Sequence, residues 1–265
     1  MAARLASRGH FVYATMRDIT KKQPLLAEVD QRGGSVCILP LDVTNPETIK
    51  AAVKEIAIER GHIDVLINNA GFGIGGFFED LTDEDLRQQM ETNFFGVLNV
   101  TREVLPLMRP RRKGKIINIS SLAGISSSPC FSAYNSSKWA LEGFSESLYH
   151  EMRLFDIDVL LVEPGTYKTK IFFEHARYAK NFFNADSPYF EISQRLRSLV
   201  DNYVTRSTKD PEEVAKLVEG LIDRKKPPLR NQPDAQAKMI FFLRRFIPFR
   251  VWAWGVRRAL IMRRD

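Results

Sequence analysis

Cysteine is scarce in this sequence, and no cluster of metal ligands accompanies it. The 265 residues include two cysteines, Cys37 and Cys130, and four histidines that stand singly. Two cysteines form no disulfide framework, and neither a Cys-x-x-Cys pair nor a histidine–cysteine group of zinc-binding spacing occurs. The sequence therefore predicts no metal site and favours a reducing, cytoplasmic compartment.

Long apolar runs are missing as well. No stretch approaches the roughly 20 uncharged apolar residues that a bilayer-spanning helix needs, and residues 1–9 are too polar for a secretory signal. Glycine and proline, at 15 and 13 residues, are not in excess, which excludes collagen-like and low-complexity chains. We therefore expect a globular protein whose length suits one α/β domain.

Acidic residues are nearly absent from the C-terminal end. The chain has a net charge of +7, and residues 239–265 hold seven arginines and one acid, Asp265. Because that segment contributes +6, only +1 remains for residues 1–238. The basic character belongs to a tail, so we expect no nucleic-acid-binding face on the domain.

Short apolar runs alternate with segments of helical period along the chain. Runs that are apolar at successive positions, such as Val65-Leu66-Ile67, suit a parallel sheet covered on both faces. This alternation predicts a doubly wound α/β domain over residues 1–228, followed by a basic aromatic tail over 229–265. Expected strands are 10–15, 35–41, 63–68, 115–120 and 158–162, and expected helices are 21–31, 46–60, 83–108, 132–155 and 211–224.

Between about residues 170 and 206 the alternation stops, and phenylalanine, tyrosine, asparagine and arginine become frequent. An irregular aromatic insertion after a strand end is typical of a substrate lid in α/β enzymes. A peripheral helical pair without a ligand role is the alternative.

The strongest chemical signal is the set Ser121, Tyr134 and Lys138. Tyr134 and Lys138 are four residues apart in a helical segment, so phenol and ammonium share one face. A nearby cation is expected to lower the pKa of the phenol toward its working range. Ser121 follows a strand at the carboxyl edge, where it can hold a substrate carbonyl.

Four further motifs accompany this set in order: Asn68-Asn69-Ala70-Gly71, Thr92-Asn93-Phe94, Ile117-Asn118-Ile119-Ser120-Ser121 and Pro164-Gly165 through Thr169. Together the residues from about 9 to 165 resemble the classical short-chain dehydrogenase/reductase family. Within that family, the sequence most resembles the branch of the 17β-hydroxysteroid and retinol dehydrogenases. The resemblance implies a single Rossmann-type domain that binds a nicotinamide cofactor and reduces carbonyls or oxidises alcohols, and that assembles as a homodimer or homotetramer through its long helices.

The resemblance also implies roles for individual residues. Tyr134 becomes the general acid/base, Lys138 its pKa partner and ribose contact, and Ser121 the residue that orients the carbonyl. Asn93 would hold a water in a proton relay from Lys138. The implied cofactor contacts are Asn69, Ala70 and Gly71, then Asp42 and Val43 at the adenine, and Pro164, Gly165 and Thr169 at the nicotinamide end. From the residues alone, Ser120 remains an alternative to Ser121. Asp42 could equally well form a turn as bind the cofactor.

The residues that select between NADP(H) and NAD(H) are expected at the end of the first predicted strand. An acidic residue there binds the free ribose hydroxyl of NAD, whereas an arginine accommodates the 2′-phosphate of NADP. The sequence has Met16 and Arg17 at this point, with Asp18 one step later. This pattern favours NADP(H), and the branch implies a bulky apolar alcohol or ketone such as a steroid, retinoid or lipid.

One part of the family's pattern is absent. Residues 1–8 look like the end of a helix capped by Gly9, so the first strand and its glycine-rich phosphate turn are missing. Gly71–Gly76 matches G-x-G-x-x-G but follows the wrong strand, and we interpret it as a flexible turn. Either the sequence begins after the true start or the protein lacks this strand; the first is favoured because the catalytic set is intact. A truncated, non-catalytic binding protein is the alternative function.

The tail supports a second hypothesis. Residues 239–264 mix phenylalanine and tryptophan with seven arginines, a composition that suits the headgroup boundary of a membrane. The alternative is a helix that packs on the domain or on a partner subunit. Pro248 is expected to break any single helix here.

Overall fold

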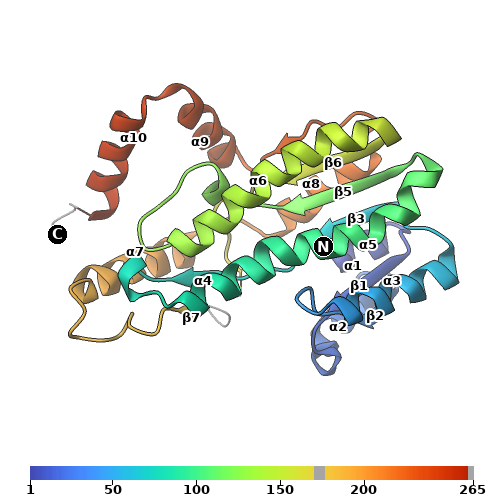
Figure 1. The fold of residues 1–265 in the computed structure, drawn as a ribbon, viewed down its shortest axis with the longest axis horizontal. Helices are drawn as coiled ribbons and strands as arrows, with labels where there is room; N and C mark the ends of the chain where they lie inside the picture. Colours follow the sequence, from blue (N-terminus) through green and yellow to red (C-terminus); the bar gives the residue numbers. More distant parts are fainter. Residues whose placement is uncertain (170–176, 262–265) are drawn as a thin grey trace.

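The computed structural model describes residues 1–169 and 177–261 (Figure 1). Two parallel sheets form its centre. One consists of β1 (Val12–Met16) and β2 (Val36–Pro40). The other has the order β3 (Val65–Asn68), β5 (Gly114–Ile119), β6 (Ile157–Val162) and β8 (Arg230–Asn231). A third, short pairing joins β4 (Ile74–Gly75) to β7 (Arg177–Tyr178).

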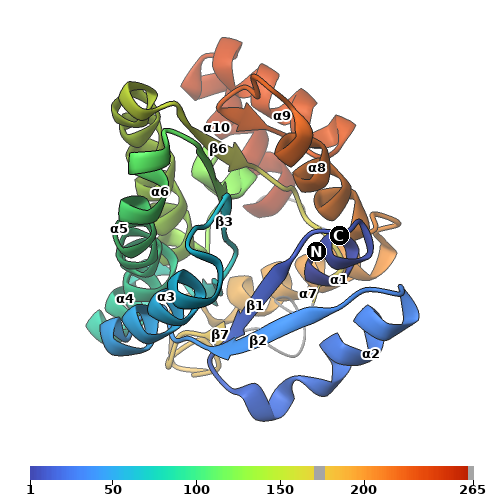
Figure 2. The same ribbon diagram turned by 90° about the vertical axis from the view of Figure 1, so that its right-hand side faces the viewer.

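Helices cover both faces of the larger sheet (Figure 2). The side chains of Ile116 and Val159 face α3 (Pro46–Arg60), α5 (Gly96–Met108) and α6 (Ser132–Met152), whereas those of Ile117 and Leu160 face α8 (Glu212–Asp223). This two-sided burial explains the successive apolar residues and confirms the predicted doubly wound Rossmann-type fold. The helices are α1 (Ala2–Ser7), α2 (Gln23–Gln31), α3 (Pro46–Arg60), α4 (Asp83–Met90), α5 (Gly96–Met108), α6 (Ser132–Met152), α7 (Phe190–Arg206), α8 (Glu212–Asp223), α9 (Ala235–Phe246) and α10 (Phe249–Val256).

The sheet is interrupted between β1 and β3. Within the described ranges no strand pairs with β1 on that side or with the free edge of β3, at the place where the sequence predicts a missing strand. On one face α3 spans the interruption, because Ala52 and Ile56 pack on the β2 side while Ile49 and Val53 belong to the cluster under β5.

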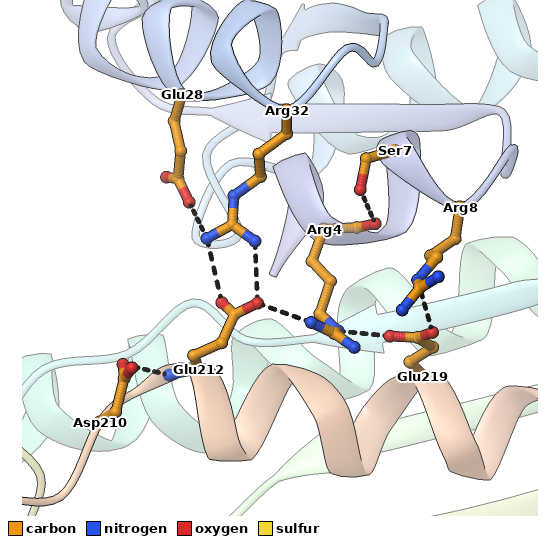
Figure 3. Close-up of polar contacts among 8 residues, drawn as sticks. All are labelled: Arg4, Ser7, Arg8, Glu28, Arg32, Asp210, Glu212 and Glu219. Atoms are coloured by element: carbon orange, nitrogen blue, oxygen red, sulfur yellow. Dashed lines mark hydrogen bonds and ion pairs between the residues drawn. The ribbon is translucent and has the colours of Figure 1, made fainter.

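On the other face, ion pairs join α1 and α2 to α8 (Figure 3). The Glu212 carboxylate accepts hydrogen bonds from Arg4 and Arg32, each at 2.8 Å. Glu219, two turns further along α8, pairs with Arg4 and, at 3.1 Å, with Arg8. Two carboxylates of α8 therefore hold the N-terminal helices against the larger sheet.

The structure differs from the elements expected from the sequence in several places. The expected long helix over 83–108 contains a π-helical turn, Glu91–Phe95, between α4 and α5. The expected irregular insertion contains α7, a helix of 17 residues, while residues 170–176 of the expected lid lie outside the described ranges. The two-residue strand β8 was not expected, whereas Pro248 separates α9 from α10 as predicted.

Candidate active site

The carboxyl ends of β3, β5 and β6 meet at one edge of the larger sheet, as parallel strands require. Asn69-Ala70-Gly71 follows β3, Ser121 follows β5 closely, and Pro164-Gly165 follows β6 closely. The last two segments are tied together, because the Leu122 N–H donates to the Pro164 carbonyl at 3.0 Å. The edge therefore gathers three of the segments singled out in the sequence.

Ser121, Tyr134 and Lys138 lie together beside this edge. Ser121 caps a short 3₁₀ helix, and its hydroxyl accepts the Ala123 N–H at 3.1 Å. Tyr134 and Lys138 come from the first turns of α6, and the Lys138 Nζ is 5.8 Å from the centre of the Tyr134 ring. A hydrogen bond with Ser121 acts on the phenol of Tyr134. Ser120, in contrast, points to Glu142 in the interior.

Burial controls the ionisation of this set. Loss of solvent raises the pKa of the Tyr134 phenol, and the hydrogen bond with Ser121 opposes the rise. The same cause lowers the pKa of Lys138 to about 8, against the field of Glu142. From the sequence we expected Lys138 to lower the pKa of Tyr134. In this structure burial raises that pKa instead, and the resting phenol stays protonated at neutral pH.

Lys138 is 6% exposed, and its ammonium donates to the Ile119 carbonyl at 2.8 Å. An ammonium has three donors, so Lys138 retains the capacity to bind hydroxyl groups at this edge.

Asn93 lies in the π-helical turn and is 1% exposed. Its amide exchanges two hydrogen bonds with the backbone of Phe72, at 3.1 and 2.9 Å, and donates to the Ser137 hydroxyl at 3.1 Å. Single π-helical turns within α-helices are frequent at functional sites. Asn93 thus joins the loop after β3 to Ser137 of α6, the residue before Lys138. Its role in a proton relay stays a prediction.

The expected cofactor contacts fall into two groups. Asn69, Ala70 and Gly71 are exposed at the edge, and a Cβ added to Gly71 would lie 3.2 Å from the Asn93 side chain. On the β6 side, Pro164, Gly165 and Thr169 are half-buried. All six residues lie on segments that lead from β3 or β6.

The remaining three lie near the ends of β1 and β2. Arg17 is exposed directly after β1. Asp42 acts as a turn former here, because its carboxylate accepts both the backbone and the hydroxyl of Thr44. Val43 packs on α5, where a Cβ on Gly96 would come within 2.7 Å of its methyl group.

The glycines of Gly71–Gly76 have a packing role that the sequence argument missed. Ile74 and Gly75 form β4, and a Cβ on Gly76 would lie 2.6 Å from the Cβ of Ala179. Part of the expected flexible turn, Ile74–Gly75, is therefore a closely packed two-residue strand beside β7.

Sequence reasoning also missed two buried polar groups. Gln89, with no exposed surface, holds the loop by bonds to the backbone of Ile74 and Phe72. Glu142 and Glu163 lie behind the site, both near Arg230. Glu142 is four residues after Lys138, and this spacing was the sequence signal that could have placed it beside the site.

The described residues at this edge fit a nicotinamide cofactor. Exposed backbone at residues 69–71 and the spare donors of Lys138 suit a sugar and a flat ring next to Tyr134. Gly73 keeps the loop close to that phenol, since a Cβ there would already touch the ring at 3.4 Å. Within the described ranges, no residue is assigned to the cofactor's pyrophosphate.

Comparison with known proteins adds an independent observation. The model of the family described as short chain dehydrogenase matches residues 1–178. A 3-ketodihydrosphingosine reductase from Bacteroides thetaiotaomicron is 38% identical over 91% of this chain and 84% of its own length. Retinol dehydrogenase 8 from Homo sapiens is 35% identical over 84% of this chain and 72% of its own length.

Solved structures agree with these relatives. A short-chain dehydrogenase from Streptomyces avermitilis superposes with a TM-score of 0.78 at 34% identity, covering 91% of this chain and 85% of that one. A metagenomic short-chain oxidoreductase in complex with NADP gives a TM-score of 0.58 at 33% identity, over 62% and 75% of the two chains.

Proposed function

This chain belongs to the short-chain dehydrogenase family, and from that premise we propose that it is an NADP(H)-dependent oxidoreductase acting on a bulky apolar alcohol or ketone. The observation that carries the proposal is the grouping of Ser121, Tyr134 and Lys138 at the carboxyl edge of the sheet. Relatives of this kind are oxidoreductases that act on CH–OH groups.

The three side chains have different roles in the reduction of a carbonyl group. A bound nicotinamide supplies or accepts the hydride. The Ser121 hydroxyl donates a hydrogen bond to the carbonyl oxygen and fixes its position. Tyr134, kept protonated by burial, gives its proton to the same oxygen, and in the reverse direction takes it back. The Lys138 ammonium stabilises the phenolate that this transfer leaves.

Two features support the finer parts of the proposal. Arg17, exposed after β1, offers a cation to a ribose 2′-phosphate, which favours NADP(H) over NAD(H). The two named relatives act, by their names, on a long-chain sphingoid ketone and on retinol. In this chain the region around β7 and α7 forms an apolar cluster that includes Tyr178, Phe182 and Leu196, and we assign it to the substrate lid.

We also propose a cytoplasmic location and assembly as a homodimer or homotetramer through the outer faces of α5 and α6. The ring of Phe95, in the π-helical turn that precedes α5, is 44% exposed and leaves an apolar side chain available beside this layer. Sedimentation equilibrium of the chain tests the assembly: a monomer at all concentrations contradicts it.

The catalytic test is turnover of reduced nicotinamide with a long-chain ketone, all-trans-retinal and, for comparison, a short ketone. We expect NADPH oxidation with the long substrates and its loss in Tyr134→Phe, by about 10²–10⁴-fold. Tyr149→Phe, a half-buried tyrosine on the same helix, is the matched control and should keep full activity. Activity retained in Tyr134→Phe removes that residue from the mechanism.

The non-catalytic alternative predicts a different outcome. A binding protein would take up NADPH or an apolar ligand without oxidising the cofactor under any condition. The grouped side chains favour the enzyme, because a binding protein has no need of a phenol and an ammonium held together.

A further inference from the structure

The last two described helices, α9 and α10, lie at one end of the molecule (Figure 1). α10 buries none of its residues, and α9 buries only Ala237. Six large apolar side chains of this pair are 54–68% exposed: Met239, Phe242, Phe246, Phe249, Val251 and Trp254. Such a concentration marks an interaction surface, since isolated exposed apolar residues are ordinary but clusters are not. We call this set the apolar platform.

The platform is organised by helical spacing. Met239, Phe242 and Phe246 stand at i, i+3 and i+7, which places them on one face of α9. The rings of Phe242 and Phe246 touch, with centroids 4.6 Å apart. On α10, Val251 and Trp254 stand at i and i+3 in the same way. Each helix therefore offers an apolar stripe to the surroundings.

Between residues 239 and 261 arginine is the only charged residue type and no acid occurs; Lys238 of α9 adds one more positive charge. Five arginines fall in the stretch: Arg244, Arg245, Arg250, Arg257 and Arg258. Two of them lie over platform rings, Arg244 at 5.7 Å from Phe249 and Arg258 at 5.5 Å from Trp254. The guanidinium groups and the apolar side chains thus share one surface.

The pair is fixed next to the candidate active site. The Trp252 indole donates to the Ser126 hydroxyl at 3.0 Å, in the loop that follows Ser121. A cavity of about 470 Å³ separates α10 from this loop and from α6, and it is lined partly by Pro129, Trp139 and Val256. Phe249 of the platform and Arg244 line this cavity too, whereas the other five platform residues do not. The platform is therefore attached at the cavity and open to the surroundings mainly through those five side chains.

We propose that α9 and α10 dock the protein on an anionic lipid surface. Aromatic side chains prefer the headgroup boundary of a bilayer, and a guanidinium binds phosphate with two parallel hydrogen bonds. α9 has 12 residues and α10 has 8, and among the described helices none is long and apolar enough to cross a bilayer. The pair thus lies in the interface, with the platform toward the acyl chains and the arginines at the phosphates.

A second copy of the chain fits the same surface less well. A two-fold interface brings the same patch of both subunits together, so five arginines would face five arginines with no carboxylate on either side. Cores of protein interfaces are also depleted in charge. The excess of positive charge favours an anionic lipid over a copy of the chain.

Co-sedimentation of the full chain with vesicles tests the proposal without any cofactor, so its outcome is independent of the proposed function. Vesicles of phosphatidylcholine alone are compared with vesicles that also contain phosphatidylglycerol. We expect binding to be ten-fold or more tighter with phosphatidylglycerol and to weaken as salt rises. Arg245→Gln/Arg250→Gln should bind roughly 5- to 25-fold more weakly, at about 5-fold per arginine.

The apolar part is tested by Phe246→Ser/Trp254→Ser, which should lose ten-fold or more in vesicle affinity. Phe78→Ser/Leu154→Ser removes side chains of equal exposure, 67% and 70%, elsewhere on the molecule, and should bind as the parent does. Circular dichroism checks that each variant is folded.

Three results overturn the proposal: no vesicle binding by the folded parent, equal affinity for both vesicles, or equal losses in the platform and control variants. A concentration-dependent dimer that Phe246→Ser/Trp254→Ser abolishes assigns the surface to a second copy instead.

Discussion

Glu212 is the carboxylate on which the N-terminal helices depend, and its replacement by glutamine should destabilise the protein. It accepts hydrogen bonds from Arg4 on α1 and from Arg32 at the end of α2 (Figure 3). Because no strand pairing joins β1 to β3 in the described ranges, these ion pairs are a main contact across the interruption on that face. Glutamine keeps the shape of the side chain and removes its charge.

The size of the effect follows from ionisation. The two arginines lower the pKa of Glu212 from 4.5 to about 2, and one unit is worth about 1.4 kcal/mol, which gives an upper limit of roughly 3.4 kcal/mol. Solvent reaches the network, since the Glu212 and Arg32 side chains are 19% and 33% exposed. We therefore expect Glu212→Gln to lose about 1–2 kcal/mol at pH 7.

The pH dependence gives a second check. A carboxylate with a lowered pKa stabilises the fold fully above its unfolded value, near 4.5, and loses this contribution as pH falls toward about 2. The difference between parent and Glu212→Gln should therefore shrink by more than half between pH 7 and pH 3.

Urea unfolding, followed by circular dichroism, measures these differences. Glu28→Gln is the matched control, because Glu28 pairs with the same Arg32 but is 46% exposed on α2, and it should cost under about 0.5 kcal/mol. Equal losses for both variants, or a Glu212→Gln loss that does not change with pH, would show that Glu212 does not hold the N-terminal helices in this way.

Three further predictions concern other parts of the molecule. Burial beside Glu142 raises the pKa of Glu163 to about 8, so the free energy of unfolding should fall as pH rises from 5 to 8. This fall should flatten in Glu163→Gln but not in Glu146→Gln, and unfolding curves measured across that pH range test the difference. Gly76→Ala should cost about 1–3 kcal/mol, because its Cβ would lie 2.6 Å from Ala179; an unchanged unfolding midpoint contradicts the close packing. Arg17→Glu should weaken NADPH much more than NADH in binding titrations, and equal losses contradict the assignment of Arg17.

Where local signals and burial agree, the sequence predicted the structure closely. The helix over 46–60 is reproduced because Asn45 caps its start, and Gly61, at φ +72°, ends it. The strands were recognised because both faces of the sheet are covered and their residues are apolar in succession. The grouping of Ser121 with Tyr134 and Lys138 was accessible from a strand end and an i, i+4 spacing.

The parts that were missed depend on contacts between distant residues. Nothing local in Glu91–Phe95 marks the π-helical turn that directs Asn93 to Phe72. β8 has two residues and exists only through its pairing with β6. Glu142 looks like an acid on a solvated helix face, and only the packing of α6 on β6 buries it. The pKa of Tyr134 was misjudged for the same reason, because spacing shows the cation but not the loss of water.

Calorimetric titration of the folded chain with NADPH and with NADH tests whether the edge that carries Ser121, Tyr134 and Lys138 binds a nicotinamide cofactor. We predict micromolar binding that favours NADPH. Binding should be clearly lost in Lys138→Met but not in Lys113→Met, because Lys113 is exposed on the surface. A folded chain that binds neither nucleotide, or binds NADPH equally well with and without Lys138, would contradict this prediction.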